Sequence, residues 1–387
     1  MKIVQVTPVY APALRYGGPV VAVHGLCRAL AARGHDVTVM TTNVDGAGVS
    51  DVPLDRPLRR DGVTIRYFPS PLLRRIFWSP ALGRALDGAM RDADLVHLHM
   101  LFQWPVWAGA RAARQARLPY VVSPRGMLVA DMVRRRNRLA KTLWLALIER
   151  GTVEGAAALQ VASELEAAEL AGFGWKLPPI AVAANGVDDP DPAVAGQPVA
   201  ADIRAAIAAR PVVLYLGRLS WKKGLDRLLR AFALTSSGTL VMAGTDDEGL
   251  SPRLAALAAR LNVGERVRIV PRTVDGADKE ALFAAARLFV LPSYSENFGN
   301  TVLEAMRRGV AVLTTPQVGA AAIVEAAQAG MVVDGDPQTF AAAMRQLIGD
   351  PARAATMGAA GRSHVVAHYG WPAMAVRVEQ LYLSLIL

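Results

Sequence analysis

Two basic residues lie five apart in a glycine-bounded segment in the second half of the chain, where Gly217-Arg218 is followed by Lys223-Gly224. The apolar run 212–216 before this segment predicts a strand, and leucines at helical spacing after it predict a helix. A strand, a loop and a helix in this order place the loop at the carboxyl edge of a sheet. Two fixed positive charges there suit a diphosphate, so we predict an anion site that contains Arg218 and Lys223.

A second segment with the same order of elements carries two carboxylates. Glu296 falls in the loop after the predicted strand 288–292, and Glu304 falls one to two turns into the helix that follows. Carboxylates accept hydrogen bonds from hydroxyl groups, and the free N–H groups at a helix start attract anions. A capping or surface role is the ordinary alternative for each glutamate. We favour ligand binding because this segment accompanies Arg218 and Lys223.

Apolar runs alternate with helical patterns along the whole chain, which predicts parallel sheets covered by helices on both faces. In the first half the predicted strands are 3–7, 36–42, 63–68, 95–99, 120–123, 159–162 and 180–183. A turn-rich segment at 185–192 ends this series, and strands 212–216, 239–243, 267–271, 288–292, 311–315 and 331–333 form a second. The 387 residues therefore predict two doubly wound α/β domains, whose ligands bind at the carboxyl ends of the strands.

The composition excludes several classes of protein. Hydrophobic residues make up 52% of the chain and charged residues 20%, which excludes disorder and collagen-like repetition. The single cysteine, Cys27, allows no intrachain disulfide and no multi-cysteine zinc site. Because the first residues lack the apolar stretch of a signal peptide and no run of 18 apolar residues occurs, we expect a cytoplasmic protein.

The positive charge is concentrated in the first half. Residues 1–187 carry 23 Lys and Arg against 14 Asp and Glu, whereas residues 188–387 carry 20 against 19. Part of the excess is a basic run formed by Arg134, Arg135, Arg136, Arg138 and Lys141, with Trp144 close by. A solvated helix face explains this run, and so does peripheral contact with an anionic membrane on its inner face. Nucleic acid is not an expected partner, since no reading motif accompanies the charge.

Two patterns that nominally suit a metal ion are weak. His97 and His99 share one face of a predicted strand, but no third ligand has supporting spacing. Asp189 and Asp191 form an Asp-x-Asp sequence within a proline-rich segment that has the character of a linker. We therefore predict no metal site and no cofactor.

The chain resembles the GT-B glycosyltransferases of the retaining, family 4 type. Gly217-Arg218-Leu219 with Lys223-Gly224 resembles the phosphate-binding loop of that family, and Glu296 and Glu304 resemble its paired glutamates. Gly17-Gly18 resembles its N-terminal glycine loop, and the segment 185–188, Asn-Gly-Val-Asp, resembles its interdomain connection. These segments occur in the family's order over nearly the full length.

This resemblance implies a GT-B fold of two Rossmann-like domains facing across a cleft. Residues 1–185, joined by a C-terminal helix at 372–387, would form the acceptor domain, and residues 186–371 would bind the nucleotide sugar. Arg218 and Lys223 would neutralise the diphosphate of the donor, Glu304 would bind the ribose, and Glu296 and His99 would lie at the transferred sugar. The resemblance places further residues at the donor, namely Gly17, Gly18, Arg272, Thr273, Asn297, Phe298, Gly299, Asn300 and Thr301. On the acceptor side it places Arg125, for which a turn-stabilising role is the alternative, and Arg135.

The implied function is retaining transfer of a sugar from a UDP- or GDP-linked donor. The acceptor would be a glycan or a polyprenyl-diphosphate-linked saccharide in bacterial-type polysaccharide biosynthesis. Since no carboxylate is clearly placed as a nucleophile, front-side displacement is the expected course. Two other functions stay open, a nucleotide-sugar 2-epimerase of the same fold and a nucleotide-sugar-binding module without turnover. An NAD-dependent enzyme is not expected, because no Gly-x-Gly-x-x-Gly follows the first strand.

Overall fold

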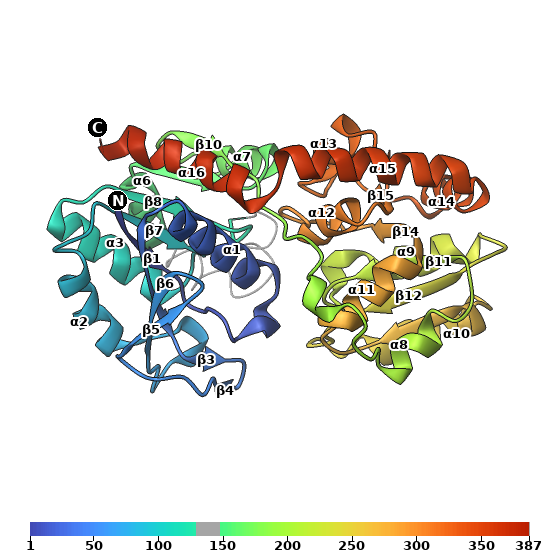
Figure 1. Cartoon of the computed structure of the whole chain (residues 1–387), viewed down its shortest axis with the longest axis horizontal. Coiled ribbons are helices and arrows are strands. Elements are labelled where there is room, and N and C mark those ends of the chain that lie inside the picture. The colour runs from blue at the N-terminus through green and yellow to red at the C-terminus, as the bar shows by residue number, and fades with distance from the viewer. Residues whose placement is uncertain (129–147, 387) are drawn as a thin grey trace. The chain divides into compact units, whose positions relative to one another are not determined.

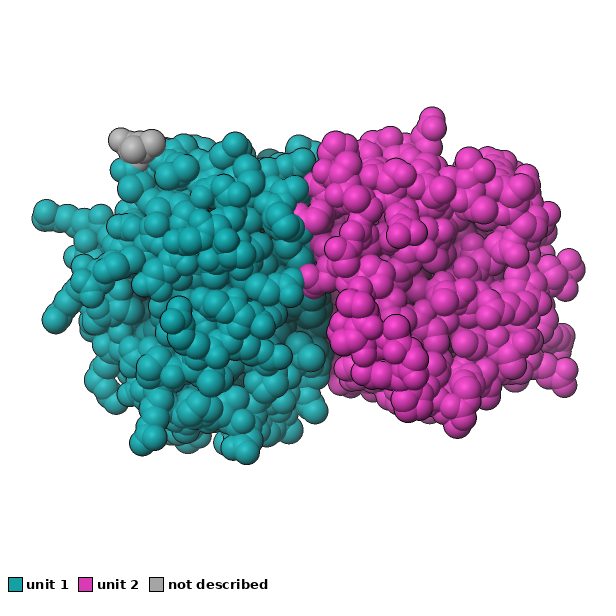
Figure 2. All heavy atoms as spheres, viewed as in Figure 1, with its two compact units in different colours: residues 1–186, 371–387 teal, residues 187–370 magenta. Residues whose placement is uncertain are grey.

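The computed structural model describes residues 1–128 and 148–386 and divides them between two compact units (Figures 1 and 2). Unit 1 comprises residues 1–186 and 371–387, and unit 2 comprises residues 187–370. The basic run at residues 134–141, which includes Arg135, lies outside the described residues together with Trp144.

Unit 1 is built on an eight-stranded sheet with the order β10-β9-β8-β7-β1-β2-β6-β5. Its strands are β1 (Lys2–Val6), β2 (Asp36–Thr42), β5 (Pro57–Arg60), β6 (Val63–Phe68), β7 (Leu95–His99), β8 (Tyr120–Ser123), β9 (Ala158–Val161) and β10 (Ile180–Val182). All neighbours pair in parallel except β5, which pairs antiparallel with β6 at the edge of the sheet. A small antiparallel hairpin, β3 (Val44–Asp45) and β4 (Gly48–Val49), follows β2.

The helices of unit 1 include one that follows unit 2 in the chain. They are α1 (Gly18–Ala32), α2 (Pro80–Ala89), α3 (Trp104–Ala116), α6 (Arg150–Glu154), α7 (Glu164–Ala171) and α16 (Trp371–Ile386), with the short 3-10 turns η1 (Leu14–Tyr16) and η2 (Arg74–Ile76). Glu379 on α16 accepts a hydrogen bond from Nε of Arg33 at 2.9 Å and pairs with His35 at 2.7 Å. The ring of Trp371 lies so close to Gly25 on α1 that an added Cβ would be 2.1 Å from it. Side-chain contacts therefore hold α16 on unit 1.

Unit 2 is built on a six-stranded parallel sheet with the order β13-β12-β11-β14-β15-β16. Its strands are β11 (Val212–Leu216), β12 (Thr239–Ala243), β13 (Val267–Val270), β14 (Ala286–Leu291), β15 (Ala311–Thr314) and β16 (Gly330–Val332). Its helices are α8 (Ala201–Ala206), α9 (Leu225–Ala233), α10 (Ser251–Arg260), α11 (Gly276–Ala285), α12 (Asn300–Arg307), α13 (Ala321–Ala326), α14 (Pro337–Gly349) and α15 (Pro351–His368), with 3-10 turns η4 (Pro192–Val194), η5 (Trp221–Lys223) and η6 (Gly264–Arg266).

The prediction of two parallel α/β sheets is confirmed, and the predicted strands coincide with the observed ones to within two residues. Strands such as β11 are buried at every position, as expected when helices cover both faces of a sheet. The sequence reading missed β5 and the β3–β4 hairpin, which are short and largely exposed. Short edge strands with little apolar alternation give a weak sequence signal.

Each sheet reverses its strand order at one point, where ligands of doubly wound folds bind. In unit 1 the reversal lies between β1 and β7, and in unit 2 it lies between β11 and β14. The loops after β11 and β14 carry the basic and the acidic residues singled out in the sequence, and β7 carries both histidines. Both candidate clusters therefore lie at positions where the topology leaves room for a ligand.

Candidate active site

The charged cluster of unit 2 depends on two loops that pack against one another. We call residues 217–224 the basic loop and residues 292–299 the glutamate loop. Gly224 adopts a φ of 65°, and a Cβ there would lie 2.1 Å from the carbonyl oxygen of Pro292. The backbone N–H of Tyr294 donates to the carbonyl of Lys222 at 2.7 Å. A glycine is required at position 224 because the two loops come into backbone contact there.

Arg227, in the first turns of α9, holds the glutamate loop in place through hydrogen bonds. Its Nε donates to the carbonyl of Pro292 at 2.6 Å, and its guanidinium also donates to the carbonyl of Ser293. The same guanidinium lies 4.2 Å from the centre of the Tyr294 ring, a distance typical of a cation–π contact. Tyr294 donates in turn to Asp226 at 3.1 Å. These bonds fix the relative positions of the residues that the two loops carry.

Lys223 and Glu296 form an ion pair across the two loops, with 18% and 17% of their side chains exposed. Burial, and then the positive charges of Arg218 and Lys222, lower the pKa of Lys223 from its usual range to about 7. The Glu296 carboxylate acts in the opposite direction and stabilises the ammonium group. A second anion at this position would stabilise it further, so the pair is well suited to receive a phosphate.

Arg218 follows Gly217 at the end of β11 and is exposed. Its carbonyl accepts a hydrogen bond from the buried Tyr215 hydroxyl at 2.7 Å, which holds the backbone while the side chain stays in solvent. Within residues 1–128 and 148–386, its guanidinium forms no ion pair. Arg218 is therefore a cation whose bidentate donor face is open to an external anion.

Glu304 lies on α12, which begins directly after the glutamate loop. Its carboxylate is 3.4 Å from the ammonium group of Lys279 on α11. Gly299 caps α12 with a φ of 90°, and the loop before it is held by backbone bonds, since Glu296 exchanges hydrogen bonds with Gln317 and Gly319 at 3.0 Å each. The backbone of Asn297, Phe298, Gly299, Asn300 and Thr301 thus forms a fixed turn into a helix N-terminus, although the Phe298 side chain is itself buried.

Arg272 and Thr273 follow β13, which two strands, β12 and β11, separate from β14 in the sheet. The Arg272 guanidinium binds Asp202 at 2.8 Å and Asp278 at 2.8 Å. These two carboxylates raise its pKa above the usual arginine range. The Arg272 side chain is therefore occupied by its bonds to Asp202 and Asp278. The neighbouring Thr273 is exposed to solvent.

In unit 1, Gly17 and Gly18 lie at the start of α1. Gly17 has a φ of 71°, and a Cβ added there would meet no atom within 4 Å. The backbone conformation, and not crowding, is therefore the reason for glycine at this position. Gly18 is exposed, so the backbone of both residues is open on this edge of the sheet.

His99 belongs to a row of buried hydrogen bonds that crosses five neighbouring strands of unit 1 or their ends. We call this row the polar relay. It begins at Arg125 after β8, and each member donates to the next in the order Arg125, His99, Gln5, Tyr382, His97, Ser123, Gln160 and the carbonyl of Ala183. Tyr382 comes from α16, and the other members lie on β1, β7, β8 and β9 or directly after β8 and β10.

The first half of the polar relay fixes the state of His99. Its Nε2 donates to the Gln5 amide oxygen at 2.6 Å, because that oxygen can only accept. Its Nδ1 faces the Arg125 guanidinium at 3.4 Å. Burial, and then the neighbouring His97 and Arg125, lower the pKa of His99 well below its usual value. His99 is therefore a neutral imidazole with both nitrogens engaged.

The second half of the polar relay fixes the tautomer and the neutral state of His97. The Tyr382 hydroxyl, which receives the Gln5 amide at 3.3 Å, donates to His97 Nδ1 at 2.5 Å. His97 Nε2 donates to Ser123 at 2.7 Å. Burial and Arg125 lower the pKa of His97 well below its usual value. Because all four histidine nitrogens have hydrogen-bond partners, this pair is not arranged to chelate a metal ion.

Arg125 has an unusual backbone conformation, and only some of its guanidinium nitrogens have hydrogen-bond partners among the described residues. Its φ is 56°, rare for a residue other than glycine, and Nη1 donates to the Asn185 amide oxygen at 2.7 Å. Its buried Nε has no hydrogen-bond partner among the residues that the structure describes. The Glu166 carboxylate, which contributes an opposing charge, accepts from the backbone N–H of Gly126 at 2.7 Å and of Ala162 at 2.8 Å.

Two family models match this chain and together span most of it. Residues 17–186 match the model described as glycosyl transferase 4-like domain, and residues 201–364 match the model described as glycosyl transferases group 1. The chain is 30% identical over 352 residues to D-inositol 3-phosphate glycosyltransferase 1 of Catenulispora acidiphila, which covers 84% of this chain and 82% of that enzyme. The chain belongs to the GT-B glycosyltransferases of the family 4 type.

Other relatives of this glycosyltransferase carry different names. The chain is 29% identical to the glycogen synthase of Mycobacterium tuberculosis, over 99% of this chain and 95% of that enzyme. It is 33% identical over 183 residues to the D-inositol 3-phosphate glycosyltransferase of Thermobispora bispora, and this match spans 44% of the chain and 42% of that enzyme. The family is therefore clear, while the named acceptors differ from one relative to the next.

Solved structures agree with the glycosyltransferase fold. Sucrose-phosphate synthase from Thermosynechococcus elongatus has a TM-score of 0.75 and 24% identity, with 100% of this chain and 99% of that chain covered. HepE of Anabaena, solved in complex with UDP and glucose, has a TM-score of 0.75 and 22% identity, with 99% and 100% covered. These likenesses confirm the predicted GT-B fold.

The sequence reading of this glycosyltransferase missed four residues that hold the predicted ones in place. Gln5, Gln160 and Tyr382 belong to the polar relay, and Arg227 fastens the glutamate loop. Gln5 and Gln160 were visible as polar residues inside otherwise apolar strands, a pattern that requires a buried partner. Tyr382 and Arg227 gave no comparable signal, because a tyrosine or an arginine is ordinary on an amphipathic helix.

No group of three or more potential metal ligands occurs in the described part of the glycosyltransferase. Asp191 instead caps η4 by accepting from the backbone N–H of Ala193 at 2.9 Å, and Asp189 pairs with Arg307. The described segments also contain no helix that is both long enough and apolar enough to cross a bilayer.

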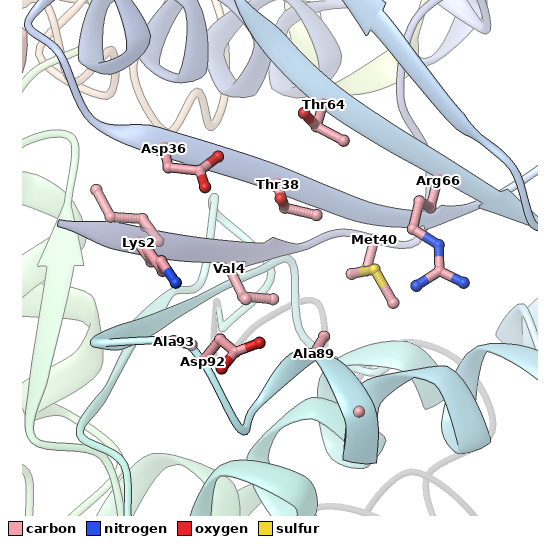
Figure 3. A pocket seen from close by; sticks show the side chains of 12 residues that line it. Lys2, Val4, Asp36, Thr38, Met40, Thr64, Arg66, Ala89, Asp92 and Ala93 are labelled. Carbon is pink, nitrogen blue, oxygen red and sulfur yellow. The ribbon is translucent and has the colours of Figure 1, made fainter.

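A cavity of about 280 Å³ lies elsewhere in unit 1, between the sheet and the end of α2 (Figure 3). Lys2 and Asp36, which begin β1 and β2, line it together with Thr64, Gly88 and Asp92. Alternate residues of β2 and β6 line it, so the cavity lies against one face of the sheet. None of the candidate site residues lines it, so this cavity is separate from the candidate active site.

Proposed function

We propose that this glycosyltransferase moves a sugar from a UDP- or GDP-linked donor, with retention of configuration and without a metal ion. The observation that carries the proposal is the ion pair of Lys223 and Glu296 beside the exposed Arg218, at the strand-order reversal of unit 2. A nucleoside diphosphate would neutralise the exposed Arg218 and share Lys223 with Glu296, and its sugar offers hydroxyls for Glu296. Glu304 would hold the ribose.

In this proposal the cations stabilise the leaving group. The negative charge on the departing diphosphate grows as the glycosidic bond breaks. Lys223 and the N-terminus of α12 are already fixed before the reaction begins, and Tyr215 holds the backbone of Arg218 beside them. Preorganised positive charge of this kind acts more strongly in the transition state than in the ground state. A metal ion would supply the same stabilisation, so we expect none to be needed.

Retention by front-side displacement fits the chemistry of the described residues in unit 1. Glu166 is the carboxylate opposite Arg125, and both of its oxygens accept backbone hydrogen bonds. His99 has both nitrogens engaged and a strongly lowered pKa, so it is suited to hydrogen bonding and not to proton abstraction. The acceptor hydroxyl would therefore bond to the anomeric carbon as its proton passes to the departing phosphate oxygen.

On the acceptor side we propose that Arg125 binds an anionic group. Its buried Nε lacks a partner among the described residues, while its other nitrogens are positioned by Asn185 and His99. Two of the similar proteins, D-inositol 3-phosphate glycosyltransferase and sucrose-phosphate synthase, are named after phosphorylated compounds. A polyprenyl-diphosphate-linked saccharide or a phosphorylated glycan would bring the same chemistry, as expected in polysaccharide biosynthesis.

We also propose that the enzyme works in the cytoplasm, in peripheral contact with an anionic membrane on its inner face. The net charge of residues 1–187, with 23 basic against 14 acidic residues, supports this position. Arg135 and its basic neighbours would contribute from outside the described residues.

The test is a panel of UDP- and GDP-linked sugars assayed for hydrolysis and for transfer, with the anomeric configuration of the product read by NMR. We expect one donor to be consumed with retention, and EDTA to leave the rate unchanged. Inversion would contradict the proposed displacement, and loss of activity on chelation, restored by Mg²⁺ or Mn²⁺, would contradict metal independence. Release of the 2-epimer of the donor sugar without any glycoside would show an epimerase.

A further inference from the structure

Three neighbouring loops of unit 1 expose aliphatic side chains together with arginines. They follow β1, β2 and β6, the strands whose carboxyl ends share an edge with β7 and β8. Hydrogen bonds and a ring contact join them, since Tyr16 accepts from the Gly46 N–H at 3.0 Å, and its ring packs against Phe77 with 6.2 Å between centres. We call them the exposed-leucine surface, formed by Leu14, Arg15, Val49, Leu72, Leu73, Arg74 and Arg75.

Leu72 and Leu73 are the most exposed part of this surface. Their side chains are 64% and 66% exposed, and Val49 and Leu14 nearby are 50% and 48% exposed. Five residues in succession, 71–75, are exposed. Single exposed aliphatic residues are common, but two adjacent leucines at a loop tip beside two more aliphatic residues form a patch of the kind that marks an interaction site.

The loop that carries the two leucines is held firmly at its base. The Ser70 hydroxyl donates to the carbonyl of Trp78 at 2.9 Å and closes the loop. Arg74 donates to the carbonyl of Ala47 at 3.2 Å and so ties the loop to the β3–β4 hairpin. Leu73 and Phe77 adopt φ values of 50° and 56°, which disfavour residues other than glycine. The surrounding contacts therefore maintain a strained backbone that keeps the leucines in solvent.

The charge of the exposed-leucine surface is positive. Asp45 is the one carboxylate on the segments 12–17, 44–49 and 69–78, and it pairs with Arg15 at 2.9 Å. Arg74 and Arg75 are exposed and have no carboxylate partner among the described residues. Leucines beside two arginines that have no carboxylate partner among the described residues match the boundary of an anionic bilayer, where acyl chains lie next to phosphates.

We propose that the exposed-leucine surface docks this enzyme on an anionic bilayer. Leu72 and Leu73 enter the boundary between headgroups and acyl chains, and Arg74 and Arg75 bind lipid phosphates. The inference rests on the proposed function, in which the acceptor is lipid-linked. Because Arg125 follows β8 at the same edge of the sheet, docking through these loops brings the acceptor-binding edge of unit 1 to the lipid surface.

Vesicle sedimentation tests the proposal on the full chain. Wild-type protein is expected to bind vesicles of phosphatidylcholine mixed with phosphatidylglycerol, to bind pure phosphatidylcholine weakly, and to dissociate as salt rises. The double variant Leu72→Ser/Leu73→Ser and the double variant Arg74→Gln/Arg75→Gln should each weaken binding to the mixed vesicles by at least about tenfold.

Matched controls make the same chemical changes elsewhere in unit 1. Leu383→Ser/Ile386→Ser removes two exposed aliphatic residues from α16, and Arg91→Gln/Arg111→Gln removes two exposed arginines. Both should bind vesicles as the wild type does. Hydrolysis of the donor sugar in the absence of lipid should be the same in all five proteins, because none of these residues belongs to the candidate active site.

Each outcome has one meaning. Vesicle binding that is absent in the wild type, or unchanged in both docking variants, overturns the docking surface. A concentration-dependent oligomer that the leucine variant disperses without lipid overturns it in favour of contact between two copies of the chain. Failure of every sugar nucleotide to be hydrolysed, with vesicle binding intact and sensitive to the variants, would contradict the proposed function and leave the docking surface standing.

Discussion

The polar relay of unit 1 and the charged loops of unit 2 occupy corresponding points of two parallel sheets, yet they are built in opposite ways. Gln5, His97 and His99 project from the strands themselves and are completely buried. Lys223 and Glu296 extend from loops beyond the strand ends and keep some contact with solvent. The same topology thus supports a neutral cluster or a charged cluster, depending on whether the polar residues lie within the strands or after them.

Burial explains the difference. A polar group inside a strand has no access to water, so it must be neutral and fully hydrogen-bonded, as His97 and His99 are. A charged group in a loop can remain ionised until a ligand arrives. We therefore expect the polar relay to contribute stability and position, and the loops of unit 2 to contribute binding energy and rate.

The largest expected effect comes from removing a cation of the basic loop. Arg218→Ala and Lys223→Ala should each lower transfer by at least about a hundredfold, equivalent to about 3 kcal/mol, because each removes positive charge from the leaving group. The neighbouring variant Lys222→Ala should cost far less. Rates are compared at saturating donor, with circular dichroism to verify folding; a near-normal rate in Arg218→Ala or Lys223→Ala would remove the diphosphate assignment.

A second experiment breaks the polar relay. Tyr382→Phe leaves the buried His97 Nδ1 without a donor and should lower the free energy of unfolding by about 1–3 kcal/mol. Tyr294→Phe removes a hydroxyl that binds Asp226 at the surface and should change stability by less than about 0.5 kcal/mol. Urea unfolding measures both variants, and equal losses in the two would contradict the contrast between the clusters.

The pH dependence of donor binding sharpens the comparison. Since the pKa of Lys223 is lowered to about 7 and an anion binds its charged form, affinity for a nucleotide sugar should fall about fivefold as pH rises from about 7 to about 8. Lys223→Arg, which stays charged, should abolish this dependence. Calorimetric titrations across pH test both expectations, and an affinity that rises with pH in the wild type would contradict them.

The smallest effect concerns Glu169 on α7, a group of unit 1 outside the polar relay. Burial and the neighbouring Glu166 raise its pKa from 4.5 to about 7. Its folded pKa lies above the unfolded one, so its contribution to stability is complete below about pH 4.5 and is lost as pH rises through 7. Glu169→Gln should therefore gain about 1 kcal/mol relative to wild type between pH 5 and pH 8. The exposed Glu164→Gln should show no such change in thermal unfolding across this range.

The sequence predicted the sheets well because buried parallel strands are continuous apolar runs, as at 212–216 and 288–291. It also indicated the basic and glutamate loops. A surface or capping role explains one such residue, but not glycine, arginine and glutamate gathered at neighbouring strand ends. The ion pair between Lys223 and Glu296 was not predictable, since the two residues are 73 positions apart and meet only when the loops pack.

The hydrogen-bond partners of the candidate site side chains were equally unpredictable from the sequence. Nothing near Arg272 indicates that Asp202, 70 positions earlier, will bind its guanidinium. His99 was predicted from the resemblance to lie at the transferred sugar, but its engagement by Gln5 and Arg125 depends on strand register and on an arginine backbone with positive φ. Register and loop conformation arise from tertiary packing, which residue spacing does not encode.

The place of α16 has a consequence for how the chain folds during synthesis. Val187–Gly370 forms one uninterrupted segment, so unit 2 can fold as soon as that segment has left the ribosome. Unit 1 is translated first but finishes last, since Trp371 and Tyr382 reach Gly25 and His97 only after all of unit 2 has been made. Throughout that interval His97 Nδ1 lacks its Tyr382 partner and Gly25 on α1 lacks the Trp371 ring, so the first domain waits in an incompletely packed state.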